Sequence, residues 1–143
     1  MDRLIIRPCK SEDIIPIAEN ISKFDRKDIE GTSPEINLAY GIHHSSICLT
    51  IQTPKGKPLG MFGVLSSSDD KATPWMLTTE ELVTTYRIQF MREGRKWADW
   101  LLTKYPILMN LIPTDHEHKW LTWVGYKDHG IYSGLRLMVK RKN

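Results

Sequence analysis

The sequence lacks the marks of several large classes of protein. Only two of its 143 residues are cysteine, too few for a disulfide scaffold and in keeping with a reducing compartment. The longest charge-free stretch, between Glu35 and Lys55, contains histidines and serines and is too polar to cross a bilayer. Charged residues also interrupt the first apolar stretch, so we expect no secretory signal.

The sequence also has only a small net charge. Twenty Lys and Arg residues against 17 Asp and Glu residues leave a net charge of +3, which does not by itself predict nucleic-acid binding. Hydrophobic residues make up 41% of the chain and charged residues 26%, a balance typical of soluble globular proteins. Such a length suits one core and not two. We therefore expect a single domain over residues 1–143, with no nucleic-acid or membrane partner and with its oligomeric state open.

The N-terminal half predicts a strand, a helix and an antiparallel hairpin. Residues 4–8 (LIIRP) predict a short buried strand ended by proline, and Ser11 is the expected N-cap of the helix that follows. Alternating hydrophobic residues over 46–53 and 58–65, around a Pro-Lys-Gly-Lys turn, predict the hairpin. Residues 24–44 show no clear pattern, and both a short helix and a loop fit the beginning of this segment.

The C-terminal half predicts one long helix between two strands. Residues 75–77 and 107–112 are rich in apolar side chains and are the expected strands. Between them, apolar residues recur at steps of three and four over 86–102, which predicts an amphipathic helix. Gly94 falls on its apolar face, where the missing side chain lets another part of the chain approach.

The end of the chain predicts a short helix and a closing strand. Thr114 and Glu117 have the spacing of a capping box in front of that helix. Gly125 is the expected left-handed residue after it. Residues 132–139 are the expected closing strand.

Several short motifs resemble one superfamily when their order and spacing are taken together. Residues 5–14 (IIRPCKSEDI) are similar to the first strand and helix of GNAT acyltransferases. The closest resemblance is to the GNAT-like gene-thirteen virion-assembly family of short-tailed bacteriophages. The resemblance implies an α/β domain with a mixed, mostly antiparallel sheet flanked by helices. The matching residues are Pro74, Trp75, Leu77 and Thr78, then Phe90, Arg92, Arg95 and Trp97, then Tyr105, Pro106, Leu108 and Asn110, and finally Trp120, Leu121, Gly125 and Tyr126.

This resemblance also implies where acetyl-CoA would bind. In GNAT enzymes the pantetheine arm pairs with an exposed strand edge, as an added strand would. The pyrophosphate then binds backbone N–H groups of a glycine-containing loop that opens the next helix. By resemblance, the cofactor-binding residues here lie on the strand edge and along the following helix: Leu77, Thr78, Thr79, Arg87, Arg92 and Arg95.

The chain departs from the enzyme pattern at two places. Residues 82–87 (LVTTYR) stand where the pyrophosphate loop is expected and contain no glycine, and two glutamates precede them. Leu121, which cannot donate a proton, stands where a tyrosine usually protonates the leaving thiolate. We assign no catalytic residue.

These departures favour a GNAT-fold phage protein that acts mainly by binding a phage or host protein. It would work in virion assembly or in modulation of a host protein, in the host cytoplasm or on the virion, with a degenerate acetyl-CoA site. An active acetyl-CoA-dependent N-acetyltransferase is the alternative.

Other features have an ordinary structural explanation beside a functional one. Arg95 and Asp99 fit a solvated helix face with an ion pair four residues apart. Trp100 and Trp123 lie nearer the edges of their apolar faces than the other tryptophans, which suits either core packing or a partner. Cys48 is expected to be a small buried hydrophobe. The histidines lack the spacing of metal ligands, so we expect no metal site.

Overall fold

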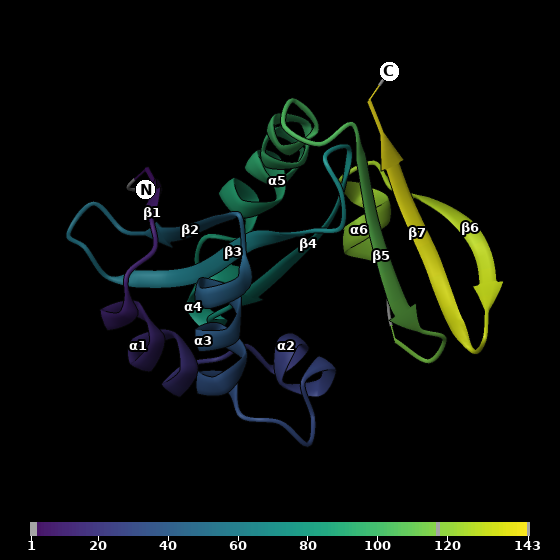
Figure 1. Ribbon diagram of the computed structural model, residues 1–143. Coiled ribbons are helices and arrows are strands. Elements are labelled where there is room, and N and C mark those ends of the chain that lie inside the picture. Colours follow the sequence, from purple (N-terminus) through teal and green to yellow (C-terminus); the bar gives the residue numbers. More distant parts are fainter. Residues whose placement is uncertain (1–2, 117, 143) are drawn as a thin grey trace. The chain divides into compact units, whose positions relative to one another are not determined.

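The computed structural model describes residues 3–116 and 118–142 and divides into two compact units (Figure 1). The first unit comprises Met1–Leu65 and Trp75–Phe90, and the second comprises Ser66–Pro74 and Met91–Asn143. Strand β4 (Lys71–Thr78) and helix α5 (Arg87–Leu102) each contribute to both units.

The described strands form a mixed sheet of seven, hydrogen-bonded in the order β1-β2-β3-β4-β5-β7-β6. The β4–β5 pair is parallel, whereas β1–β2, β2–β3, β5–β7 and β6–β7 are antiparallel. The expected α/β class, with a mixed and mostly antiparallel sheet flanked by helices, is confirmed.

The first unit packs short helices against the strands of its sheet. In Figure 1, helices α1 and α3 lie together on one side of β2 and β3. A buried cluster joins them, made of Ile17, Ala18, Ile21, Leu38, Met61 and Leu77. The elements of this unit, besides its part of β4 and α5, are β1 (Ile5–Pro8), a 3₁₀ turn η1 (Ser11–Asp13), α1 (Ile14–Glu19), α2 (Lys23–Asp28), α3 (Pro34–His44), β2 (Ile47–Gln52), β3 (Pro58–Ser66) and α4 (Glu80–Thr84).

Strand β1 is the outermost strand of its edge and pairs only with β2 among the described strands. The backbone of Cys9, just after the strand, donates inward to the carbonyl of Cys48. In an antiparallel pair the neighbouring residue then points its N–H outward. That neighbour is Pro8, which has no N–H, so the proline removes no hydrogen bond from the ladder.

The second unit places a helix pair beside three strands. Its elements, besides its part of β4 and α5, are β5 (Ile107–Pro113), α6 (Lys119–Trp123), β6 (Lys127–Tyr132) and β7 (Leu135–Arg141). A Cβ atom on Gly94 would lie 2.9 Å from Cζ2 of Trp120, so the expected close approach at this glycine is confirmed. Gly125 has φ +108° and follows α6, as expected.

Several expected boundaries were wrong. The closing strand is a hairpin, β6 and β7, whose turn holds Ser133 and Gly134 at φ +52° and +80°. Helix α6 begins at Lys119, and Thr114 lies in a turn. Glu117, the other half of the expected capping box, lies outside the described residues.

At the other end, Ser11 begins the 3₁₀ turn rather than capping a helix, and α1 starts at Ile14. The unpatterned segment 24–44 holds both α2 and α3.

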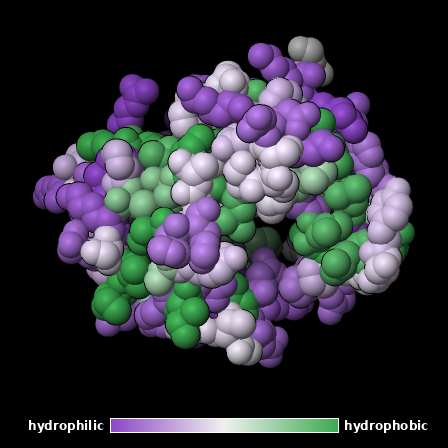
Figure 2. Space-filling view, in the orientation of Figure 1, coloured by the Kyte–Doolittle hydropathy of each residue, from purple (hydrophilic) through white to green (hydrophobic). Residues whose placement is uncertain are grey.

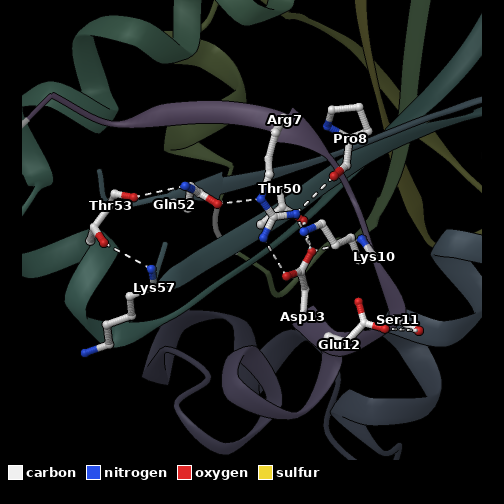
Figure 3. Close-up of polar contacts among 10 residues, drawn as sticks. All are labelled: Arg7, Pro8, Lys10, Ser11, Glu12, Asp13, Thr50, Gln52, Thr53 and Lys57. Atoms are coloured by element: carbon white, nitrogen blue, oxygen red, sulfur yellow. Dashed lines mark hydrogen bonds and ion pairs between the residues drawn. The ribbon is translucent and has the colours of Figure 1, made fainter. Parts of the chain in front are cut away.

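Asp13 ties β1 to the start of α1 (Figure 3). Its carboxylate, 2% exposed, accepts two hydrogen bonds from Arg7 at 2.7 and 2.9 Å. It also accepts from the N–H of Lys10 at 2.9 Å and from the hydroxyl of Thr50 at 2.8 Å. Burial acts to raise the pKa of Asp13, but these donors outweigh it and hold the pKa below its ordinary value.

Asp13→Asn should lower the free energy of unfolding by about 2–4 kcal/mol at pH 7, because the buried donors lose a charged acceptor. The lowered pKa of Asp13 gives stability that is present above the unfolded pKa near 3.8 and is lost as pH falls through the folded value. The deficit measured by urea unfolding should therefore shrink below about pH 4. The exposed neighbour Glu12→Gln is the control, and a deficit unchanged from pH 7 to the acid limit would contradict the assignment.

Candidate functional site

The end of β4 carries three of the residues assigned by resemblance to the cofactor. Leu77, Thr78 and Thr79 are 6%, 4% and 2% exposed. The N–H of Thr79 donates to the carbonyl of Leu59 in β3 at 2.9 Å. Because successive backbone groups of a strand point to opposite edges, the N–H and C=O of Thr78 face away from β3. Thr78 therefore presents its backbone groups at the strand edge that the resemblance predicts for a pantetheine arm.

That edge is occupied by the start of α2. Asp25, 6% exposed, accepts a hydrogen bond from the N–H of Thr78 at 2.7 Å and from its hydroxyl at 2.5 Å. The N–H of Ser22 donates to the carbonyl of Thr78 at 2.8 Å, and the two hydroxyl oxygens lie 2.9 Å apart. Both backbone groups of Thr78 are thus satisfied within the first unit.

The local sequence explains why Asp25 sits there. Ser22 is the N-cap of α2 and accepts from the N–H of Asp25 at 3.1 Å, which fixes the first turn of the helix. One residue earlier, Ile21 forms an isolated antiparallel bridge with Thr79. The Ser-x-x-Asp spacing at 22–25 signals a helix start, but nothing in it indicates a partner in β4.

Burial disfavours the ionised form of Asp25, and its hydrogen bonds only partly offset this effect. Burial raises its pKa, the nearby carboxylate of Asp28 raises it further, and the bonds from Thr78 and Ser22 act in the opposite direction. An acidic group held this way needs its donors, so the cluster of Ser22, Asp25 and Thr78 is a tightly coupled unit.

The segment after β4 is a helix where the pyrophosphate loop was expected. Helix α4 is capped by Thr79, and Leu82 is fully buried in it. Glu81 pairs with Lys57 at 2.5 Å, and Glu80 accepts from the N–H of Lys23 at 3.0 Å.

Arg87 then begins α5 and is exposed. At this edge the N–H of Thr78 is occupied, the following segment offers no glycine, and three carboxylates lie within or beside it.

In the second unit, the side chain of Arg95 contacts Trp123 of α6 and does not pair with the acidic residue expected as its partner. Its Nε donates to the carbonyl of Trp123 at 2.8 Å, and its guanidinium lies 3.8 Å from the centroid of the Trp123 ring. The expected pair of Arg95 with Asp99 is wrong, because Asp99 pairs with Lys140 at 3.2 Å. Arg92 is exposed and lies 4.0 Å from Glu93.

The indole of Trp123 is hydrogen-bonded within the second unit, yet the residue is partly exposed. Its Nε1 donates to the carbonyl of Met91 at 2.8 Å, while 39% of the residue remains accessible. Trp100 is 42% exposed, so the expected position of both at the edges of their apolar faces is confirmed. Trp100 follows Arg95 by five residues, which is about 140° around the helix, so the two belong to different faces of α5.

Exposed hydrophobic side chains are otherwise spread over both units. Figure 2 shows hydrophobic groups interspersed with hydrophilic ones on the face that it presents. Hydrophobicity alone therefore does not single out a docking surface. The exposed residues are Ile5, Ile15, Phe24, Ile36, Tyr40 and Ile88 in the first unit, and Trp100, Leu111, Trp123, Ile131 and Tyr132 in the second.

Strands β4 and β5 pair at their beginnings. Their register contains two pairs, Lys71 with Ile107 and Ala72 with Leu108. Close to these pairs, Nδ2 of Asn110 donates to the carbonyl of Pro74 at 2.8 Å. The buried Oδ1 of Asn110 has no hydrogen-bond partner among the described residues.

Comparisons with known proteins identify the fold. No family model matches the chain, and no curated protein matches its sequence. Among solved structures, it is similar to an acetyltransferase from Agrobacterium tumefaciens, with a TM-score of 0.73 and 13% identity over 98% of this chain and 91% of that one. The fold is that of the GNAT acetyltransferases.

Two further structures agree with it. A GNAT-family acetyltransferase from Bacillus anthracis has a TM-score of 0.70 and 8% identity over 98% of this chain and 95% of that one. A GNAT-superfamily phosphinothricin acetyltransferase from Sinorhizobium meliloti, solved with AcCoA, has a TM-score of 0.65 and 11% identity over 96% and 88% of the two chains. At these identities the likeness shows the fold, and the phage subfamily stays a prediction.

Within residues 3–116 and 118–142, no three His, Cys, Asp or Glu side chains are grouped so as to hold a metal ion. No helix in the same part of the chain is long and apolar enough to span a bilayer.

Asp25 generates a prediction with a pH dependence opposite to that of Asp13. Its raised pKa means that protonation favours the folded state, so its contribution to stability falls as pH rises through the folded pKa. Asp25→Asn, which cannot ionise, should therefore gain stability relative to the wild type between pH 3 and pH 7. Asp25→Ala, which leaves the N–H of Thr78 without an acceptor, should lose about 1–3 kcal/mol throughout. Urea unfolding of the three proteins tests both, and a pH-independent difference for Asp25→Asn would refute the first expectation.

Proposed function

We propose that this protein acts mainly by binding another protein and that its acetyl-CoA site is degenerate. The observation that carries the proposal is the hydrogen bond at 2.7 Å from the N–H of Thr78 to the buried carboxylate of Asp25. A pantetheine arm at this edge would have to displace Asp25 and leave a buried acid without its donors, at a cost of about 1–3 kcal/mol or more. Cofactor binding at Thr78 is therefore opposed by an interaction within the protein itself.

Two further features support a degenerate site. Helix α4 replaces a glycine-containing loop, and its glutamates would repel a diphosphate. Leu121, in the place where the resemblance implies a tyrosine, offers no proton to a leaving thiolate.

The surface of the second unit formed by Arg95 and Trp123 suits a protein partner. Tryptophan and arginine supply much of the binding energy of many interfaces. The Trp123 indole is already held by Met91 and Arg95, so ordering it on binding costs little conformational entropy. By the motif resemblance, we infer that the partner is a phage or host protein and that binding serves virion assembly or modulation of a host protein, in the host cytoplasm or on the virion.

An acetyl-CoA-dependent N-acetyltransferase is the second candidate, and one observation favours it. The buried Oδ1 of Asn110 in β5 has no hydrogen-bond partner among the described residues. Such an acceptor is available to a ligand donor. For this candidate, the first turn of α2 would have to leave Thr78.

Titration calorimetry with acetyl-CoA separates the two candidates. We expect no heat of binding at millimolar ligand for the wild-type protein, because Asp25 holds the strand edge. Micromolar binding would overturn the proposal and favour the transferase. In that case Arg92→Ala, which changes an exposed residue, should weaken the affinity if α5 holds the phosphates.

Capture of a partner tests the Trp123 surface. Trp123→Ala should reduce the amount of partner recovered by the tagged protein from cells that naturally make it by at least about tenfold. Trp100→Ala, on another face of α5, is the matched control and should leave recovery unchanged. Circular dichroism must show that both variants are folded, and full recovery by folded Trp123→Ala would exclude this surface.

A further inference from the structure

The two cysteines of the chain oppose each other across the first strand pair. The β1–β2 register runs from Ile5 opposite Gln52 to Pro8 opposite Leu49, which makes Cys9 and Cys48 the next opposed residues. The pairing continues to them, because the N–H of Cys9 donates to the carbonyl of Cys48 at 3.2 Å. Directly opposed residues project from the same face of a sheet, so both side chains lie on one side.

The Cα spacing expected for this pair lies within the range that disulfide bridges span. Opposed residues at a hydrogen-bonded antiparallel position have Cα atoms about 5.5 Å apart. Disulfides span Cα separations of about 4.4–6.8 Å. Both thiols are free, half-buried and packed against the core cluster of the first unit.

We propose that Cys9 and Cys48 form a cross-strand disulfide when the protein meets a small disulfide oxidant such as oxidised glutathione. The Cys9 thiolate attacks one sulfur of the oxidant, whose S–S bond breaks, and one glutathione thiolate leaves and takes up a proton. Cys48 then gives its proton to water and attacks the Cys9 sulfur, which expels the second glutathione. Two protein thiols are oxidised to one disulfide, and one oxidised glutathione is reduced to two thiols.

The second step limits the rate. Burial raises the pKa of Cys48, and the hydrogen bond and charge of Cys9 and the carboxylate of Asp13 raise it further. Other charged groups near Cys9 are the guanidinium of Arg7, which is bound to Asp13, the adjacent Lys10, and Glu12. Capping of Cys9 by glutathione removes the repulsion from its charge and leaves burial as the main barrier. Closure should therefore accelerate by close to tenfold per pH unit above neutrality.

The Cys9–Cys48 disulfide would link the two ends of the helical segment between β1 and β2. Residues 9–48 contain η1 and helices α1 to α3, so the disulfide would close a loop around the segment that includes Asp25. Closing a loop of this length constrains the unfolded chain and raises stability. The inference stands on the β1–β2 register and does not depend on the proposed function.

The full-length protein treated with excess oxidised glutathione at pH 7 and pH 9 tests the proposal. We expect an intact mass lower by two hydrogens, a non-reduced peptide map that links the Cys9 and Cys48 peptides, faster closure at pH 9 and a Tm higher by several degrees. Cys48→Ser should stop at a glutathione adduct on Cys9 with no rise in Tm. Free thiols, a persistent glutathione adduct or intermolecular dimers in the wild-type protein at pH 9 would each overturn the proposal.

Discussion

The hydrogen bonds from Thr78 to the buried carboxylate of Asp25 are the constraint on which the first unit depends. They join the end of β4 to the first turn of α2, two segments that are 53 residues apart in the chain. The N–H of Ser22 donates to the carbonyl of Thr78 at the same strand edge. Because these groups are buried, they stay satisfied only if β4, α2 and their connection to α1 form together. Both backbone groups of Thr78 at this strand edge are thereby hydrogen-bonded within the first unit.

Two buried acids of the first unit illustrate how surroundings decide the state of a carboxyl group. Asp13 faces a guanidinium and two neutral donors, and its pKa falls. Asp25 faces only neutral donors and another carboxylate, and its pKa rises. Burial raises the pKa of both groups and is the largest cause for Asp25, whereas for Asp13 it is outweighed by hydrogen bonds that include those of the Arg7 guanidinium. Protonation of Asp25 therefore favours the folded state, whereas the contacts of Asp13 with Arg7 favour an ionised carboxylate.

The sequence supported predictions where a pattern is local and long. Helix α5 repeats its apolar positions over several turns, and the β2–β3 hairpin alternates on both sides of a turn. Helix α3 was missed although Ser33 and Pro34 have the residue types of a helix start, because Ile36 and Tyr40 are 70% and 55% exposed and blur its apolar face. The position of Thr78 on the strand edge followed from resemblance. Its partner Asp25 did not, since tertiary contacts between distant segments leave no mark on either local pattern.

The proline that ends β1 has a consequence for the behaviour of the protein in concentrated solution. An outer strand usually presents a row of donors and acceptors to which another chain can add. At the outward position nearest the end of β1, Pro8 supplies no donor and its ring stands where a neighbouring backbone would approach. Edge-to-edge association through this strand is thereby discouraged at no loss to the ladder with β2, which is a form of protection against aggregation built into a single residue.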